Sequence, residues 1–204
     1  MDRLHRVGQD ADMEPNRETV PGDAALESRT ETLGAMSRDA YLAFERTQPM
    51  RHEYVDGWVY AMVGATRRHE DIAMNLSAAS HAHLQGNPCR VYKGDLKLQV
   101  GDDFYYPDVQ VRCGDEPGDQ RFETAPVFIA EVLSPSTRRY DRGDELTLYR
   151  TLASLDAYAL IERDVMRVCV YRAGLEEPEV LTLPNERLTL PSLDFAMTLA
   201  ALYD

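Results

Sequence analysis

Apolar and polar residues follow two different periods along this chain, and the change of period marks the expected elements. Residues 67–85 have apolar side chains three or four positions apart, as at Ile72 and Leu76, which predicts a helix. Residues 127–133 read VFIAEVL, a nearly continuous apolar run. Such a run is typical of a central strand that is covered on both faces. The pattern therefore predicts a domain that contains both helices and a buried central strand.

Two short polar turns predict hairpins. Asp56-Gly57 lies between apolar-rich runs, which is the strongest short-range signal for a hairpin. The segments CRVYKGDLKLQV and FYYPDVQV flank the letters GDD at 101–103 and predict a second hairpin. A loop formed by the two aspartates of GDD would place Lys97 opposite Asp108, so that both side chains would share one face of the sheet.

The beginning of the chain has a different character from the rest. Residues 1–35 contain prolines, glycines and many charged residues without a sustained apolar period, which predicts a disordered tail. The folded domain is expected over residues 36–204, beginning with a helix capped by Ser37. A later helix is expected over about residues 140–152. Further strands are expected at YALIE and RVCVYR and near 179–183 and 187–190, followed by a C-terminal helix.

Charge and cysteine content narrow the function classes. With 22 basic and 35 acidic residues the net charge is -13, so the overall field repels polyanions, and binding of nucleic acid would need a local basic surface. An apolar run long enough for a membrane span is absent from the sequence, as is a secretory signal at its beginning, so a cytoplasmic location is expected. Cys89, Cys113 and Cys169 lie far apart, which predicts reduced structural thiols.

Glu131 is the most informative single residue because it interrupts the apolar strand. A buried carboxylate costs several kcal/mol unless it is paired, protonated or bound to a cation. Asp108 follows Pro107, which cannot donate to a strand ladder and so marks a strand edge or bulge. Two such carboxylates on neighbouring strands predict a site for Mg²⁺ or Mn²⁺. The alternative for Glu131 is an ion pair with an arginine such as Arg138.

Several motifs together resemble one known family. They are RHEYVDG at 51–57, RHE at 68–70, YYPDV at 105–109, EVLSPSTRRYDRG at 131–143 and SLDAYALIE at 154–162. Over about residues 36–204 the chain resembles the family described as "putative restriction endonuclease" (the Uma-two group) within the PD-(D/E)XK nucleases. The resemblance implies an α/β (α+β mixed) fold with a restriction-endonuclease-like core, in which a central mixed β-sheet is flanked by helices. It also implies Mg²⁺-dependent hydrolysis of phosphodiester bonds in DNA, and a homodimer.

The resemblance also implies roles for individual residues. Asp108 and Glu131 would hold the metal, and Glu53 would supply a further carboxylate, with a solvated strand-end charge as its alternative. The nuclease motif places a lysine two residues after the glutamate, where this chain has Leu133. In this family the lysine occurs instead in a D-R-G-x-K pattern, and here that position is Glu145.

Two residues offer ways to replace the missing lysine. Lys97 would supply the positive charge if it faces Asp108, and its alternative is charge balance within a strand. Glu145 would instead bind a second metal ion, which would restore the positive charge. Four further side chains are candidates for contacts with substrate, namely Arg138, Arg142, His69 and Tyr149. Their respective alternatives are a solvated loop for the two arginines, a helix cap for the histidine, and a core aromatic for the tyrosine.

Three hypotheses about function follow from these patterns. The first is a metal-dependent endonuclease that acts on DNA. The second is a catalytically weakened relative that binds nucleic acid or protein without cutting, because the lysine of the family is missing. The third is a structural homodimer module in which Asp108 and Glu131 pair with arginines. Binding of a divalent metal separates the third hypothesis from the other two, and cleavage separates the first from the second.

Overall fold

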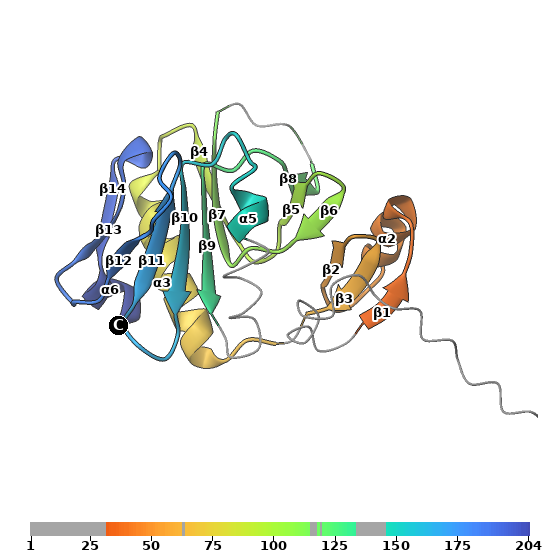
Figure 1. The fold of residues 1–204 in the computed structure, drawn as a ribbon, viewed down its shortest axis with the longest axis horizontal. Helices are drawn as coiled ribbons and strands as arrows, with labels where there is room; N and C mark the ends of the chain where they lie inside the picture. Colours follow the sequence, from red (N-terminus) through yellow and green to blue (C-terminus); the bar gives the residue numbers. More distant parts are fainter. Residues whose placement is uncertain (1–31, 63, 115–117, 119, 134–145) are drawn as a thin grey trace, which may run out of the picture.

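The computed structural model describes residues 32–62, 64–114, 118, 120–133 and 146–204. Figure 1 shows a large sheet on the left, a group formed by β1–β3 and α2 on the right, and β5, β6 and β8 between them. The predicted tail, apart from its last four residues, and the segment 134–145 lie outside the described residues. No helix in the described part is long and apolar enough to cross a membrane.

The main sheet has the strand order β12-β11-β10-β9-β7-β4. Only β9 and β10 run parallel among these neighbours, so the sheet is mixed. Its strands are β4 (Cys89–Lys93), β7 (Val109–Cys113), β9 (Phe128–Leu133), β10 (Ala157–Glu162), β11 (Val168–Arg172) and β12 (Glu179–Leu181). All six residues of β9 are buried, which confirms the central strand that the apolar run predicts.

The second sheet has the strand order β1-β3-β2-β6-β5-β8. Its strands are β1 (Thr32–Ala35), β2 (His52–Val55), β3 (Trp58–Ala61), β5 (Lys97–Val100), β6 (Asp103–Tyr105) and β8 (Phe122–Glu123). The Asp56-Gly57 hairpin is confirmed, because both residues have positive φ, as a type I′ turn requires. β1 pairs with β3, so residues 32–35, which the sequence analysis assigned to the tail, form a strand.

The second predicted hairpin is divided between the two sheets. β4 pairs with β7 in the main sheet, whereas β5 pairs with β6 in the second sheet. The predicted loop was wrong, because Val100 pairs with Asp103 and the loop is Gly101-Asp102. Gly101 has φ +61°, which suits the first central position of a type II′ turn. Lys97 is therefore not opposite Asp108.

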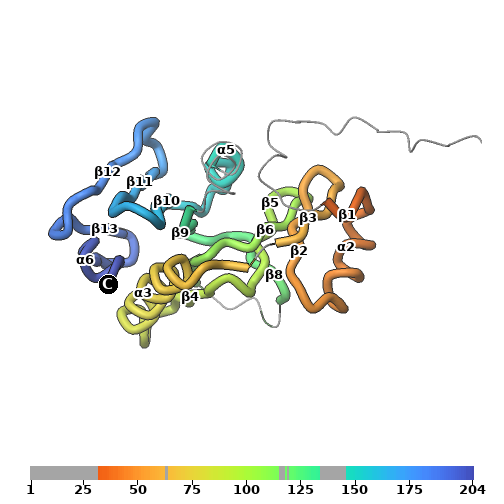
Figure 2. Tube along the Cα trace, turned by 90° about the horizontal axis from the view of Figure 1, so that it is seen from below, coloured from red at the N-terminus to blue at the C-terminus, as the bar shows by residue number. Residues whose placement is uncertain are grey.

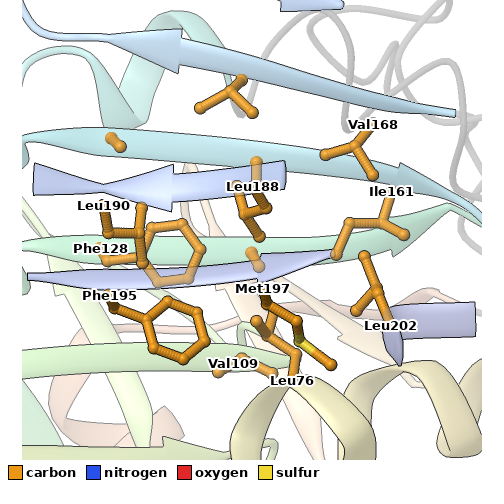
Figure 3. Close-up of a cluster of buried hydrophobic side chains, with 14 of the residues drawn as sticks. Leu76, Val109, Phe128, Ile161, Val168, Leu188, Leu190, Phe195, Met197 and Leu202 are labelled. Atoms are coloured by element: carbon orange, nitrogen blue, oxygen red, sulfur yellow. The ribbon is translucent and has the colours of Figure 1, made fainter. Parts of the chain in front are cut away.

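Helix α3 (Arg67–His83) covers one face of the main sheet. Its buried Ile72 and Leu76 pack against side chains of β7, β9 and β10, and β13 (Arg187–Leu190), β14 (Phe195–Thr198) and α6 (Leu199–Tyr203) complete this core. Figure 3 shows Leu76 beside Val109, with Phe128 and Phe195 in the same cluster. The predicted helix at 67–85 is confirmed apart from its last two residues.

A second core lies on the opposite face of the main sheet. Alternate residues of β9, Ile129 and Leu133, pack there with Tyr149 of α5 (Leu146–Tyr149) and with Leu98 of β5. In Figure 2, α5 and α3 lie on opposite sides of β9. Of the helix predicted over residues 140–152, the described part is this short α5. Because side chains alternate along a strand, Glu131 shares the face of Ile129 and Leu133.

Helix α2 (Arg38–Glu45) packs on the second sheet through aromatic side chains. The rings of Tyr41 and Tyr54 stack with their centroids 5.0 Å apart, and Phe104 lies beside them. Ser37 accepts a hydrogen bond from the N–H of Ala40, which confirms its predicted role as the N-cap. This small third core fixes α2 to the strands that lead into β7.

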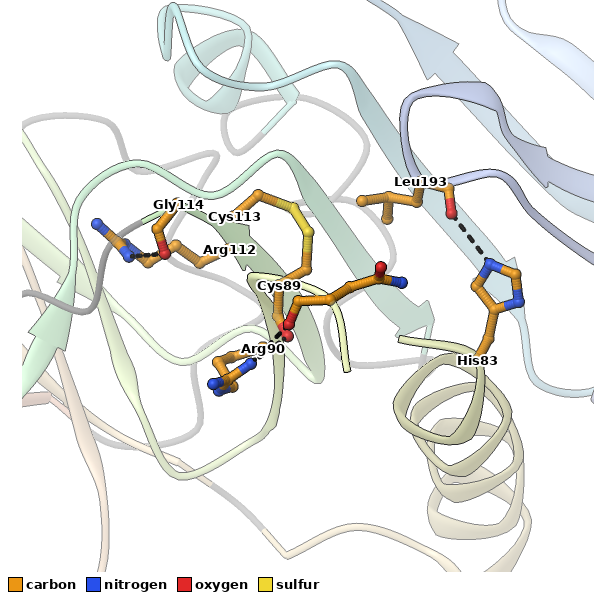
Figure 4. The surroundings of a disulfide bond; sticks show 8 residues. His83, Cys89, Arg90, Arg112, Cys113, Gly114 and Leu193 are labelled. Carbon is orange, nitrogen blue, oxygen red and sulfur yellow. Dashed lines mark hydrogen bonds between the residues drawn. A yellow bond between two sulfur atoms is a disulfide. The ribbon is translucent and has the colours of Figure 1, made fainter. Parts of the chain in front are cut away.

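Two of the three cysteines are joined, contrary to the prediction of reduced thiols. Cys89 of β4 and Cys113 of β7 face each other across the antiparallel pair and form a disulfide, whereas Cys169 is free and buried. Figure 4 shows this disulfide at the ends of the two strands. This pairing could not be expected from the sequence, because residues 24 positions apart meet only through the strand register.

Candidate active site

The candidate site forms where β9 extends beyond its neighbour β7. Val109 is the first residue of β7 and pairs with Ala130, so the last three residues of β9 lie beyond the start of β7. The carboxylate of Asp108 replaces a backbone acceptor of β7 at this point, because its Oδ2 accepts a hydrogen bond of 2.7 Å from the backbone N–H of Val132. In return, Oε2 of Glu131 accepts a hydrogen bond of 3.2 Å from the backbone N–H of Asp108.

This reciprocal arrangement holds two carboxylates next to each other. Glu131 is only 9% exposed, and Asp108 is partly buried. Two neighbouring carboxylates repel each other, and burial strengthens this repulsion because it reduces screening by water. A cation bound between them would offset both the repulsion and the desolvation. The pair that the sequence analysis proposed is therefore together in the structure.

His69, in the first turn of α3, contacts Asp108 of this pair. Its Nε2 lies 2.9 Å from Oδ1 of Asp108. Burial lowers the pKa of His69, but the hydrogen bond and the charge of Asp108 outweigh this effect, so the pKa is raised above 6.5. The alternative of a helix cap was wrong, because the cap is Thr66, whose side chain accepts from the N–H of His69 at 3.4 Å.

Glu53 of β2 approaches the site from the second sheet. Its Oε1 accepts a hydrogen bond of 3.4 Å from the backbone N–H of Tyr106, two residues before Asp108. Glu53 thus lies beside the segment that leads into β7. The expectation that it supplies a further carboxylate stays a prediction, because this contact places it near the pair without making it a ligand.

Lys97, on the second sheet, lies near the segment that leads into β7. It is paired with Phe122 of β8, and its Nζ lies 5.6 Å from the centre of the Tyr106 ring. Burial lowers the pKa of Lys97 below the ordinary 10.5, and the charge of Glu45 opposes this shift. Lys97 is therefore close to residues 106–108 through Tyr106 and not through direct pairing with Asp108.

The remaining candidates divide into buried residues and residues outside the described part. Tyr149 is fully buried, with its ring edge-to-face with Tyr105 and Tyr158 at 5.8 and 5.3 Å. It thus has the core position that was the alternative to a contact with substrate. Arg138, Arg142 and Glu145 lie outside the described residues.

The carboxylate oxygens of Asp108 and Glu131 are the atoms of this site that could hold a cation. Among the described residues, no group of three or more His, Cys, Asp or Glu side chains could hold a metal ion. Mg²⁺ is usually bound by one or two carboxylates, with water and substrate phosphate completing the shell. Each carboxylate oxygen has two lone pairs, so the oxygens of Asp108 that accept one hydrogen bond each can still bind a cation.

A buried polar network that was not predicted from the sequence lies next to the site. It comprises Glu45, His52 and Tyr106, which come from α2, β2 and the segment before β7. No spacing rule connects positions 45, 52 and 106, so their meeting depends on the docking of α2 on the second sheet. The one available signal was the position of Glu45 four residues after Tyr41, on the same face of the helix.

Comparisons with known proteins agree with this structure. The model of the family Uma2, described as "Putative restriction endonuclease", matches residues 38–201. "Uncharacterized protein slr1290" of Synechocystis sp. is 35% identical over 176 residues, which are 82% of this chain and 91% of that protein. "Uncharacterized protein sll1609" of the same organism is 30% identical over 157 residues, which are 74% of this chain and 88% of that protein.

A solved structure supports the fold. The crystal structure of "a putative nuclease belonging to DUF820" from Anabaena variabilis matches with a TM-score of 0.69 and covers 82% of this chain and 97% of that one. At 20% identity this likeness concerns the fold alone, and it confirms the restriction-endonuclease-like core that the motifs imply. Because the family model matches most of this chain, the chain belongs to the Uma2 family, described as "Putative restriction endonuclease".

Proposed function

We propose that this protein is a metal-dependent endonuclease that hydrolyses phosphodiester bonds in DNA. The observation that carries the proposal is the pair Asp108 and Glu131, in which each carboxylate accepts a hydrogen bond from the backbone of the other's segment. The pair offers only oxygen ligands, which favours Mg²⁺ or Mn²⁺. The family description supports nuclease activity, and our proposal adds DNA as the substrate and a divalent metal as the cofactor.

Each residue of the site would have a separate role. Asp108 and Glu131 hold the cation, and Glu53 stands beside them as a further carboxylate. When bound, the metal supplies a more acidic water and compensates negative charge on the phosphate. His69 orients Asp108 through the contact of 2.9 Å. Arg138 and Arg142 remain the proposed contacts to phosphate groups of the substrate.

The net charge of -13 shapes the proposed mode of binding. The overall field does not attract DNA, so affinity has to come from basic side chains close to the scissile phosphate. Binding would then weaken with salt only modestly, in proportion to the few phosphates contacted. A homodimer and a cytoplasmic location stay predictions that derive from the resemblance and the sequence.

A second candidate is a weakened relative that binds nucleic acid or protein without cutting. Leu133 occupies the position two residues after Glu131 and is fully buried, so an apolar side chain stands where the nuclease motif has its lysine. The position to which the family lysine moves is Glu145. Without a positive charge there, the transition state would lose electrostatic stabilisation, which typically costs a factor of about 100 or more in rate.

The test is calorimetric titration of Mg²⁺ and Mn²⁺, followed by incubation with supercoiled plasmid DNA. The variants are Asp108→Ala and Glu131→Gln, and Asp102→Asn, on the exposed hairpin loop, is the matched control. We expect wild type and control to bind metal and to nick DNA, and both site variants to do neither. Metal binding without nicking would favour the weakened relative. A wild-type protein that binds no metal would refute the proposed site.

A further inference from the structure

The segment 106–108, which carries Asp108 into the site, is held by side chains from other elements. It lies between β6 and β7 and belongs to neither strand. Pro107 has no N–H, the N–H of Tyr106 donates to Glu53 at 3.4 Å, and that of Asp108 donates to Glu131 at 3.2 Å. The position of Asp108 therefore depends on how firmly its neighbours in this segment are fixed.

Tyr106 is the anchor of this segment. Its side chain is 7% exposed, and its hydroxyl donates a hydrogen bond of 2.7 Å to Oε1 of Glu45. Lys97 and Arg51 place their positive charges 5.6 and 5.9 Å from the centre of the ring. Burial and the hydrogen bond to Glu45 raise the pKa of Tyr106, so the hydroxyl keeps its proton and remains a donor.

Glu45 is itself fixed on both carboxylate oxygens. Oε1 also accepts from the backbone N–H of His52 at 3.0 Å, and Oε2 lies 3.0 Å from Nδ1 of the same histidine. The carbonyl of His52 in turn accepts a hydrogen bond of 2.7 Å from the hydroxyl of Tyr41. With an exposed fraction of 8%, Glu45 is a buried and well-paired carboxylate. Charge-assisted hydrogen bonds of this kind are stronger than neutral ones.

We infer that Glu45 is a positioning residue for Asp108 and acts through Tyr106, an inference that rests on the proposed metal site. The link between the two is short and stiff. Only Pro107 separates Tyr106 from Asp108, and its ring fixes φ, so that a displacement of Tyr106 passes directly to the carboxylate. The end of α2 thereby controls the geometry of a site whose ligands come from β9 and the start of β7.

The variant that isolates this link is Tyr106→Phe, which removes the hydroxyl and keeps the ring. Its matched control is Tyr54→Phe on the second sheet. Tyr54 is 6% exposed, and its hydroxyl donates to the carbonyl of Met36 at 3.1 Å. Both variants remove the hydroxyl hydrogen bond of a buried tyrosine, but only Tyr106 is joined to Asp108. A purely structural role predicts the same behaviour for both.

The first measurement needs no metal. Amide hydrogen exchange of Val132 reports the hydrogen bond of 2.7 Å that this N–H donates to Asp108. We expect Tyr106→Phe to speed the exchange of this amide by about tenfold relative to its strand neighbours, and Tyr54→Phe to leave it unchanged. The second measurement is the Kd for Mn²⁺, which we expect to rise by about tenfold in Tyr106→Phe alone, as for other residues that support a metal ligand.

Glu45 is tested by two variants of graded severity. Glu45→Gln keeps an oxygen that can accept from Tyr106, so we expect it to restore most of the Val132 protection and Mn²⁺ affinity that Glu45→Ala loses. If Glu45→Ala does not fold, Tyr106→Phe and Glu45→Gln carry the test. Equal exchange at Val132 in the two tyrosine variants would overturn the inference.

The outcome for this inference can be separated from that for the proposed function. Loss of metal binding in Asp108→Ala together with identical behaviour of Tyr106→Phe and Tyr54→Phe would refute only the positioning role. A wild-type protein that binds no Mn²⁺ would refute the proposed function. In that case the Val132 amide would still show whether Tyr106 positions Asp108.

Discussion

Replacing Asp108 by asparagine separates the charge of this side chain from its hydrogen bonds. Asparagine can accept from the N–H of Val132 through its oxygen and donate to Nε2 of His69 through its amide, the two contacts that Asp108 makes at 2.7 and 2.9 Å. Alanine loses both contacts and leaves the Val132 N–H without its acceptor. A hydrogen bond to a charged group contributes about 1.5–3 kcal/mol and a neutral one about 1 kcal/mol.

The expected costs follow from these contacts. Asp108→Ala should lower the free energy of unfolding by about 3 kcal/mol or more, because two charge-assisted bonds are lost. Asp108→Asn should lower it by only about 1 kcal/mol, because neutral bonds replace them and the repulsion between Asp108 and Glu131 disappears. Both variants should lose the binding of divalent metal, since a neutral amide is a poor replacement for a carboxylate ligand.

The pH dependence of stability gives a second test of the contact between His69 and Asp108. The pKa of His69 is raised above 6.5 in the folded protein, so the stability from its contact with Asp108 is fully present below that value and is lost as the pH rises through the folded pKa. Asp108→Asn should therefore be more costly at about pH 5.5 than at about pH 9.

Urea unfolding of wild type and both variants at these two pH values is the assay. A cost of Asp108→Asn that is equal at both pH values would contradict the proposed charge interaction with His69. Equal costs for the asparagine and alanine variants would show that the two hydrogen bonds of Asp108 do not contribute as the structure implies.

Three further predictions concern the rest of the molecule. Leu76→Ala, in the core under α3, should cost about 2–5 kcal/mol in urea unfolding, whereas Met74→Ala on the exposed side of the same helix should cost less than about 0.5 kcal/mol. Cys89→Ala together with Cys113→Ala should lower stability by about 3 kcal/mol relative to the oxidised protein, and the difference should vanish when the wild type is measured with a reductant. Lys97→Met should slow cleavage by about 100-fold with unchanged affinity for Mn²⁺ if Lys97 supplies the positive charge, and an unchanged rate would direct attention to a second metal at Glu145.

The elements whose signal is local were predictable from the sequence. The helix at 67–83 and the strand at 128–133 follow from the spacing of apolar residues, and the turn at 56–57 follows from the intrinsic preference of Asp-Gly for positive φ. The burial of Glu131 was also predictable, because this carboxylate lies within an apolar run that is typical of a covered strand.

The register of the second hairpin was not predictable, and the error has a physical cause. The sequence pattern treats each run as one strand, but the two runs bend between Lys93 and Lys97 and at Pro107 and pass from one sheet to the other. Which glycine or aspartate forms the two-residue loop depends on backbone dihedral angles. A shift of the loop by one residue moved Lys97 away from Asp108.

The sequence by itself determined which carboxylates are candidates for the proposed metal site, and the tertiary structure decided how they are held. The contacts from His69 and the backbone of Val132 to Asp108, and the network from Glu45 through Tyr106, join residues that are 24 to 61 positions apart. Local propensities act over a few residues and cannot specify such meetings. The contacts of His69 and Glu45 arise only when α3 docks on the main sheet and α2 on the second sheet, because burial of the apolar helix faces brings the polar groups at the helix ends into contact. The contact of Val132 with Asp108 arises from the pairing of β9 with β7.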